Sequence, residues 1–162
     1  MVTMLARVFE HHRWANLRTA EACRDLTDSQ LDATADGTAG SIRDTLLHIA
    51  GAEQRYVQRL EDREPTFHER DGWMGIDAVR EALDATGQIF IALADAQEHD
   101  ALVETAYQGK PVTLHRSTIL AQAITHAAEH RSQIATILTQ LGIAPPDVSA
   151  WTWGIEMHGG GP

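Results

Sequence analysis

Cysteine is almost absent from this chain of 162 residues, which contains only Cys23. A single thiol cannot form a disulfide within the chain, and it excludes the Cys-x-x-Cys pairs that bind zinc or exchange electrons. Such cysteine usage is typical of a reducing compartment, so we expect a cytoplasmic protein. The N-terminal segment also lacks the uncharged apolar stretch of a signal peptide, which agrees with that expectation.

Positive charge and long apolar runs are scarce as well. The 13 Lys and Arg residues are outnumbered by 23 Asp and Glu residues, which gives a net charge of -10. A surface this acidic repels phosphate backbones and anionic lipid, so we expect neither a nucleic-acid nor a membrane partner. No run of about 18 or more apolar residues is present, which excludes a membrane-spanning helix. The length and ordinary composition predict a single domain over residues 1–162.

Several catalytic motifs are missing. The chain has no Glu-x-x-His pair for a di-iron carboxylate site, no glycine-rich phosphate loop and no Gly-x-Ser-x-Gly elbow. It has nine histidines instead. Neutral imidazole is the commonest metal ligand in proteins, so the histidines are the first candidates for a functional site.

Apolar residues recur at helical spacing in four segments, 5–26, 42–60, 79–93 and 119–141. Ser41 and Asp77 are the expected N-caps of the second and third segments. The residues expected to face the core are Leu5, Val8, His12, Ala15, Thr19, Ala22 and Leu26; Ile42, Thr45, Ile49, Ala52, Tyr56 and Leu60; Val79, Leu83, Thr86, Phe90 and Leu93; and Ile119, Ala123, His126, His130, Ile134, Ile137 and Leu141. Helices with one apolar stripe each can bury it only against one another, which predicts an all-α four-helix bundle.

The connections carry their own signals. Residues 27–31 are typical of a short capped helical turn, and residues 61–75 of a polar connection. Residues 102–114 alternate around a glycine turn, which predicts a small β-hairpin in the long connection before the last helix. We expect residues 155–162 to form a flexible tail. Exposed tryptophans just before that tail, Trp151 and Trp153, favour a homodimer.

His126 and His130 are the strongest pair of candidate ligands. They stand four residues apart on the last expected helix, so both rings project from one face and can bind the same ion. Their neighbours one turn away, Ala123 and Ile134, belong to the apolar stripe, so the rings should point into the core. The alternative is that both rings hydrogen-bond to backbone or water, and the spacing alone does not decide between the two.

The remaining histidines are more ambiguous. His48 lies on the flank of its helix, beside Thr45 and Ala52, where an interface or surface histidine is the usual interpretation. His12 lies in register on the first helix, where packing competes with a contact to the site. We expect the other histidines to be solvated: His11, His68, His99, His115 and His158.

The segment from His126 to His130 also matches His-x-x-Glu-His, the inverted zincin pattern, in which Glu129 would be a general base. A five-residue pattern is weak evidence. Nothing else in a short helical chain indicates a peptide-binding cleft, so a peptidase is disfavoured.

Several stretches together resemble the DinB/YfiT-like family. Residues 12–16 (HRWAN) are similar to its Trp-Ala-Asn segment, and residues 41–49 (SIRDTLLHI) to its second-helix segment that ends in a histidine. The turn at Gly109 precedes the last helix, and residues 126–134 (HAAEHRSQI) are similar to its His-x-x-x-His-Arg-Gly-Gln signature. The resemblance covers residues 4–142. Two positions depart from the family pattern. Ser132 stands where glycine is usual, and Glu129 stands where many members have another histidine or a variable residue.

The resemblance implies a four-helix bundle that holds one divalent metal ion with His48, His126 and His130. Zn²⁺ and Ni²⁺ are the first choices for nitrogen ligands, and Fe²⁺ and Mn²⁺ stay open. It also implies a thiol-dependent S-transferase or isomerase that acts on a small molecule together with a low-molecular-weight thiol. We then expect Glu129 to act as an acid–base group. We expect His12, Asn16 and Gln133 to contact the metal ligands or the substrate.

Other functions use the same ligands. Three nitrogen ligands leave at least one position for water or substrate, whereas a structural zinc is usually closed by four protein ligands. A metal-dependent hydrolase is therefore one alternative, with Glu129 as its base. A metal-binding stress-response protein without turnover is the other.

Overall fold

The structure, a computed structural model, describes residues 2–96 and 99–159. Within those ranges the chain is mostly helical, with one small antiparallel sheet of two strands, and the expected all-α character is confirmed. In chain order the elements are α1 (Met4–Ala22), α2 (Asp28–Leu31), α3 (Ile42–Glu61), the 3-10 helix η1 (Glu69–Asp71), α4 (Ile76–Asp95), β1 (Leu102–Tyr107), β2 (Lys110–His115), α5 (Arg116–Gln140) and α6 (Ala150–His158).

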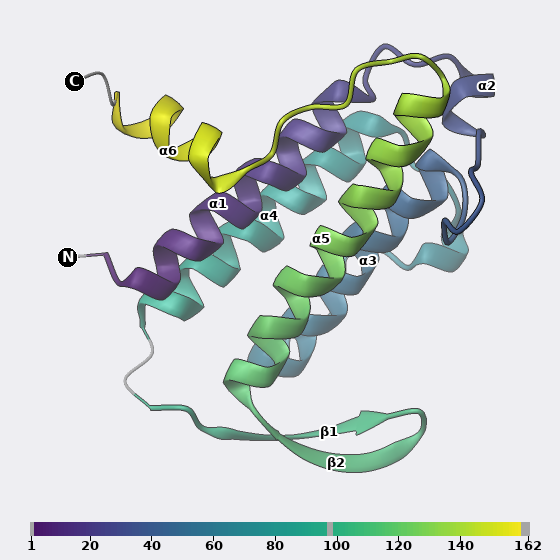
Figure 1. Cartoon of the computed structure of the whole chain (residues 1–162). Coiled ribbons are helices and arrows are strands. Elements are labelled where there is room, and N and C mark those ends of the chain that lie inside the picture. The colour runs from purple at the N-terminus through teal and green to yellow at the C-terminus, as the bar shows by residue number, and fades with distance from the viewer. Residues whose placement is uncertain (1, 97–98, 160–162) are drawn as a thin grey trace.

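The long helices α1, α3, α4 and α5 lie side by side and enclose the core (Figure 1). Helix α1 runs along α4, and α3 packs against both α4 and α5. Near one end of the core the rings of Phe9 and Phe90 stack at a centroid distance of 5.4 Å. Towards the other end, aliphatic side chains from all the long helices fill the core, among them Ile42, Leu46, Leu83, Ile134 and Leu138.

Side-chain caps fix where α3 begins, as the sequence predicts. The Ser41 hydroxyl accepts the backbone N–H of Asp44, and the Asp44 carboxylate lies within hydrogen-bond reach of Ser41 in return. Helix α4 differs from expectation, because its N-cap is Gly75 rather than Asp77. Gly75 has a φ of 90°, which glycine adopts without strain. Asp77 lies in the first turn, where a carboxylate interacts favourably with the helix dipole.

The buried face of α1 differs from the expected stripe. Leu5 and Val8 are 38% and 42% exposed, whereas Phe9 is fully buried because α1 turns this large ring towards Phe90. The rest of the buried face consists of small or polar residues; His12, Ala15 and Thr19 were expected there, whereas Ala6, Asn16 and Ala20 fall outside the expected stripe. At the far end of α5, Leu141 is also exposed rather than in the core.

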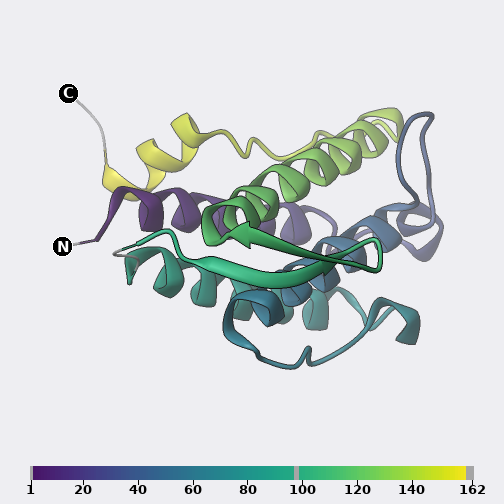
Figure 2. The ribbon, with the colours of Figure 1, turned by 90° about the horizontal axis from the view of Figure 1, so that it is seen from below.

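The predicted hairpin is present. Strand β1 pairs antiparallel with β2, and Tyr107 lies opposite Lys110. Gln108 and Gly109 between them both have positive φ, the backbone of a tight two-residue hairpin turn. The hairpin lies across one end of α3 and α5, where β1 contacts α3 and β2 contacts α5 (Figure 2).

The C-terminal segment contains a helix that the sequence pattern did not indicate. Residues 155–158, assigned to a flexible tail from the sequence, form the last turns of α6, while residues 160–162 lie outside the described residues. Helix α6 is capped by Ser149 and tied to α1 by an ion pair between Arg18 and Glu156. No helix in the described ranges is both long and apolar enough to cross a membrane.

Candidate metal centre

Three histidines from two neighbouring helices meet at one point. His48 comes from the middle of α3, and His126 and His130 from one face of α5. One candidate ligand atom from each residue lies within 4.8 Å of the others. The ring centroids are 4.5 to 4.9 Å apart. The structure therefore brings together the three residues that the family resemblance singles out.

The spacing of the ring nitrogens fits a shared ion. The Nε2 atoms of His48 and His126 are 3.1 Å apart. Two nitrogens bound to one tetrahedral zinc ion at about 2.0–2.1 Å would lie about 3.3 Å apart. The two lone pairs repel each other at this distance unless a proton or a cation lies between them. The donor set therefore suits a divalent metal ion.

The outer nitrogens of two of these rings are already held by oxygen atoms. His48 Nδ1 lies 2.8 Å from a carboxylate oxygen of Glu69, and His130 Nδ1 lies 2.8 Å from the amide oxygen of Gln133. Both oxygens are acceptors, so each Nδ1 is the donor and each Nε2 keeps a free lone pair. Such bonds fix the tautomer and the direction of a metal-binding imidazole.

The electrostatic environment keeps His126 neutral. Burial is the main cause that lowers its pKa, followed by the electrostatic effects of His130, His48 and Arg55, and the pKa falls to about 4. At neutral pH this imidazole is therefore deprotonated and available as a ligand.

Glu69 is a functional candidate that sequence reasoning missed. It lies in η1, between α3 and α4, where it accepts hydrogen bonds from His48 and Arg55. Burial alone would raise the pKa of this carboxyl, but those two hydrogen bonds and the charge of Arg55 lower it below its usual value. The carboxylate is therefore ionised and can hold the His48 ring in place.

A glycine in α3 makes room for Glu69. A Cβ atom added to Gly51 would lie 2.6 Å from the Glu69 Cγ, which is much closer than real carbon contacts. Glycine in a helix interior costs about 0.5–1 kcal/mol relative to alanine. Because glycine is unfavourable there, Gly51 in the middle of α3 is the one signal in the sequence that another segment packs closely against this helix.

The other predicted site residues separate into two groups. Gln133 contacts the cluster through His130, as expected for a supporting residue. Glu129 is exposed on α5, and within the described residues it makes no hydrogen bond or ion pair with the three histidines. His12 and Asn16 are buried in a separate polar network.

That network is centred on Glu53, which is 1% exposed. One carboxylate oxygen lies 2.8 Å from His12 Nε2 and 2.6 Å from the Asn16 amide nitrogen. The other accepts the Thr86 hydroxyl at 2.6 Å, and Arg131 donates to the Asn16 amide oxygen at 2.5 Å. The network links α1, α3, α4 and α5, and one of its members, Arg131, follows His130 directly in α5.

The histidines expected to be solvated do not all behave alike. His68, His99 and His115 are exposed, as expected. His11 is half-buried instead, with Nε2 at 2.9 Å from the Val148 carbonyl and its ring against Trp153. His11 therefore helps to attach the segment before α6 to α1.

Cys23 is not a reactive thiol. Burial raises the pKa of its thiol to about 12, so a thiolate does not form at neutral pH.

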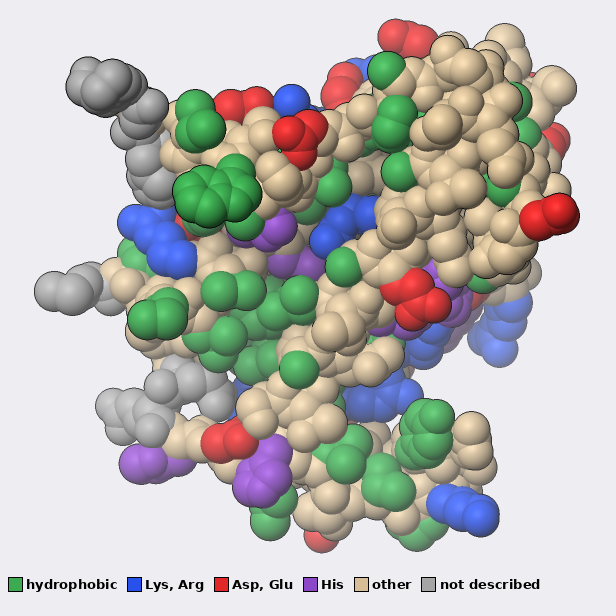
Figure 3. All heavy atoms as spheres, in the orientation of Figure 1, with side chains coloured by type: hydrophobic (Ala, Val, Ile, Leu, Met, Phe, Trp, Pro, Cys, Tyr) green, Lys and Arg blue, Asp and Glu red, His purple; other side chains and the backbone are tan. Residues whose placement is uncertain are grey.

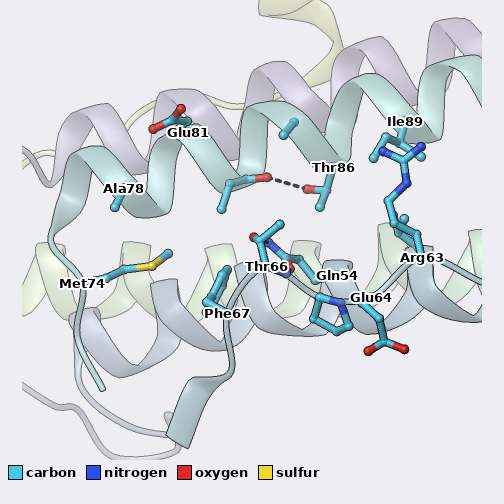
Figure 4. Close-up of a pocket in the computed structure, with 14 residues that line it drawn as sticks. Gln54, Arg63, Glu64, Thr66, Phe67, Met74, Ala78, Glu81, Thr86 and Ile89 are labelled. Carbon is cyan, nitrogen blue, oxygen red and sulfur yellow. Dashed lines mark hydrogen bonds between the residues drawn. The ribbon is translucent and has the colours of Figure 1, made fainter. Parts of the chain in front are cut away.

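One hollow is lined by two of the three histidines, and two larger cavities contain none of them. The first, of about 260 Å³, reaches His48 and His130 past Asp44 and Thr45. Another, of about 450 Å³, lies under the hairpin and includes Tyr56, whose ring is 6.0 Å from that of His126. A further cavity of about 440 Å³ between α3 and α4, shown in Figure 4, includes none of the three histidines.

Comparison with known proteins identifies a family for this chain. No curated protein matches the chain. A family model described as the DinB family matches residues 1–154, which is nearly the whole chain. Its match includes every helix that contributes to the histidine cluster and to the Glu53 network. The chain therefore belongs to the DinB family.

Proposed function

We propose that the chain binds one divalent metal ion through His48, His126 and His130, and that it is a metal-dependent enzyme of the thiol-dependent S-transferase or isomerase type. The observation that carries the proposal is the convergence of three imidazole nitrogens within 4.8 Å of one another. We interpret the packing of the long helices as the four-helix bundle that the family resemblance implies. Zn²⁺ and Ni²⁺ suit this all-nitrogen set best, and Fe²⁺ and Mn²⁺ are the other candidates.

The residues around the cluster support an open, reactive site. Glu69 and Gln133 orient two of the rings from outside, so the ligands are held before any ion arrives. The hollow beside His48 and His130 leaves room for a small molecule. A divalent ion held here would act as a Lewis acid towards a thiol or a polar group of the substrate.

A small molecule is the partner that the surface favours. On the face shown in Figure 3, basic side chains are scattered among acidic ones and form no continuous patch. Together with the net charge of -10, this supports a small-molecule substrate rather than nucleic acid. The homodimer and the cytoplasmic location stay predictions, and sedimentation of the purified protein tests the first.

The transferase or isomerase proposal is tested with the metal-loaded protein. Several low-molecular-weight thiols are offered together with electrophilic acceptors and isomerisable substrates, and the His48→Ala variant serves as the inactive control. We expect thiol-dependent turnover that disappears in the variant. Metal-loaded wild-type protein that is inert towards every combination would contradict the proposal.

The two alternatives differ from it in what they require. A non-catalytic metal-binding protein would retain the ion but would neither capture an added thiol on it nor turn over substrate. A hydrolase with Glu129 as base would lose most of its rate in Glu129→Gln with its metal content unchanged. Glu129 is exposed and makes no hydrogen bond with the three histidines in the described part of the chain, which gives the hydrolase no structural support.

A further inference from the structure

A second hollow beside the histidine cluster has a distinct chemical character. It has a volume of about 450 Å³ and is lined by residues of α3, the hairpin and α5. Helix α3 contributes Arg55, Tyr56 and Arg59 to its wall, the hairpin contributes Thr105 among others, and α5 contributes Gln122. None of the described residues that line it is acidic. The hollow lined by His48 and His130, in contrast, includes Asp44 and Glu69.

This cavity adjoins the candidate metal centre. The Tyr56 ring stands nearly perpendicular to that of His126, at a centroid distance of 6.0 Å. Gln122 lies one helical turn before His126 on α5, a rise of about 6 Å. Arg55 is paired with Glu69, the carboxylate that holds His48. None of the three histidines lines the cavity itself, but Tyr56 connects its wall with the ring of His126.

Arg59 supplies an uncompensated positive charge inside the cavity. Its Nε donates to the Thr105 hydroxyl and one terminal nitrogen donates to the Arg55 carbonyl, both at 3.2 Å. Within the described part of the chain it forms no ion pair with a carboxylate, whereas the charge of Arg55 is balanced by Glu69. A half-buried arginine with neutral partners only is well suited to bind an anion, because its planar donors match a carboxylate.

The remaining wall indicates the size and nature of the ligand. Thr118 and Gln122 offer neutral hydrogen-bonding groups, and Leu114 and Ile119 form an apolar surface opposite α3. A single uncompensated cation suits a single negative charge. We propose that this cavity binds a small organic carboxylate, with Arg59 as the anchor for the carboxylate and the apolar part of the molecule directed towards His126.

The proposal rests on the proposed function only for the orientation of the ligand towards His126. The interaction of the carboxylate with Arg59 needs no metal. It is therefore tested on metal-free protein, in which a carboxylate cannot bind to an ion instead. Benzoate and benzamide have the same shape and differ in charge, so their dissociation constants, measured by NMR titration, isolate the contribution of the anion. Inorganic phosphate serves as a third probe.

We expect benzoate to bind about tenfold more tightly than benzamide, the size of one charged hydrogen-bonded contact. The largest shifts should fall on the backbone amides of Thr105 and Gln122. Arg59→Gln should reduce the preference to less than about twofold, and Arg59→Lys should keep part of it. Arg63→Gln is the matched control, because it removes the same charge just beyond the end of α3 and should leave the preference unchanged.

Contacts in the wild-type protein test the same placement without a substitution. Nuclear Overhauser effects should connect the benzoate ring with the methyl groups of Leu114 and Ile119. Equal affinity for benzoate and benzamide, shifts confined to other parts of the protein, or tighter binding of phosphate would each overturn the proposal. Metal analysis of the same samples separates the two ideas. A carboxylate preference in a protein that never binds metal removes the proposed function alone, and a metal-binding protein without the preference removes this inference alone.

Discussion

Arg131 of α5 donates a hydrogen bond of 2.5 Å to the side-chain oxygen of Asn16 in α1, although the two residues are 115 positions apart. They belong to residues 12–16 and 126–134, two stretches that carry the family resemblance. Part of the family pattern therefore joins helices through a buried polar network, while another part supplies the histidines. Burial lowers the pKa of Arg131 to about 10, and the nearby charge of Glu53 opposes that effect.

Removal of Glu53 should destabilise the fold strongly. In Glu53→Ala, His12, Asn16 and Thr86 all lose a buried acceptor, and Arg131 loses the nearby negative charge. Loss of one partner from a buried ionic network costs about 3–5 kcal/mol. Urea denaturation of the metal-free protein measures the free energy of unfolding. Glu129→Ala, which removes the same side chain from an exposed position, should change it by less than about 0.5 kcal/mol. Equal losses in the two variants would contradict the role of the network.

Much of the fold could be predicted from local sequence signals. Ser41 caps α3 and the glycine turn closes the hairpin, because both depend on neighbouring residues only. The buried face at the N-terminal end of α1 could not be predicted in this way, although His12, Ala15 and Thr19 are buried as expected. Leu5 and Val8 are apolar at helical spacing, yet they lie outside because Phe9 packs against Phe90 of another helix. Helix α6 was missed, since two prolines precede it and glycines follow it, while its contacts are with distant residues of α1.

The site was predictable to a similar extent. The spacing of His126 and His130 shows that they share a face, but only the family resemblance selects His48, whose position on the flank of α3 is otherwise ambiguous. Glu69 and Glu53 could not be found, because their partners are far away in the sequence. The short His-x-x-Glu-His pattern indicates Glu129 as a base, but this residue is exposed on α5.

Glu69 should control metal affinity without being a ligand. In Glu69→Gln the His48 ring loses its charged acceptor, and outer partners of this kind are worth about 10- to 100-fold in affinity. Competition with a chromophoric chelator measures the change. Glu64→Gln, an exposed substitution in the same connection, should leave the affinity unchanged. Equal affinity in Glu69→Gln and the wild type would show that the ring needs no such support.

Gly51→Ala should separate helix stability from metal affinity. Alanine favours a helix interior over glycine by about 0.5–1 kcal/mol. Its Cβ would meet the Glu69 side chain at 2.6 Å, so the carboxylate must move away from His48. We expect metal affinity to fall as in Glu69→Gln, while the melting temperature of the metal-free protein stays the same or rises. Undiminished affinity would contradict the close packing of Glu69 on α3.

The low pKa of His126 makes the metal-free protein sensitive to acid. The folded protein holds this imidazole at a pKa of about 4, whereas its ordinary value is 6.5. The unfolded chain therefore takes up the proton first, so the contribution to stability is complete above about pH 6.5 and declines as the pH falls towards 4. NMR titration of the His126 ring should give a midpoint near pH 4. A midpoint near pH 6.5 would show that the ring is solvated.

The presence of one ion on three imidazoles is tested most directly by elemental analysis of protein purified without a histidine tag. We expect one divalent metal ion per chain in the wild type, and little or none in His48→Ala, His126→Ala and His130→Ala with the helical circular dichroism retained. His115→Ala, which removes an exposed histidine, should keep the full complement. Metal-free wild-type protein that fails to take up any divalent ion, or a His48→Ala variant that still holds a full equivalent, would contradict the shared site.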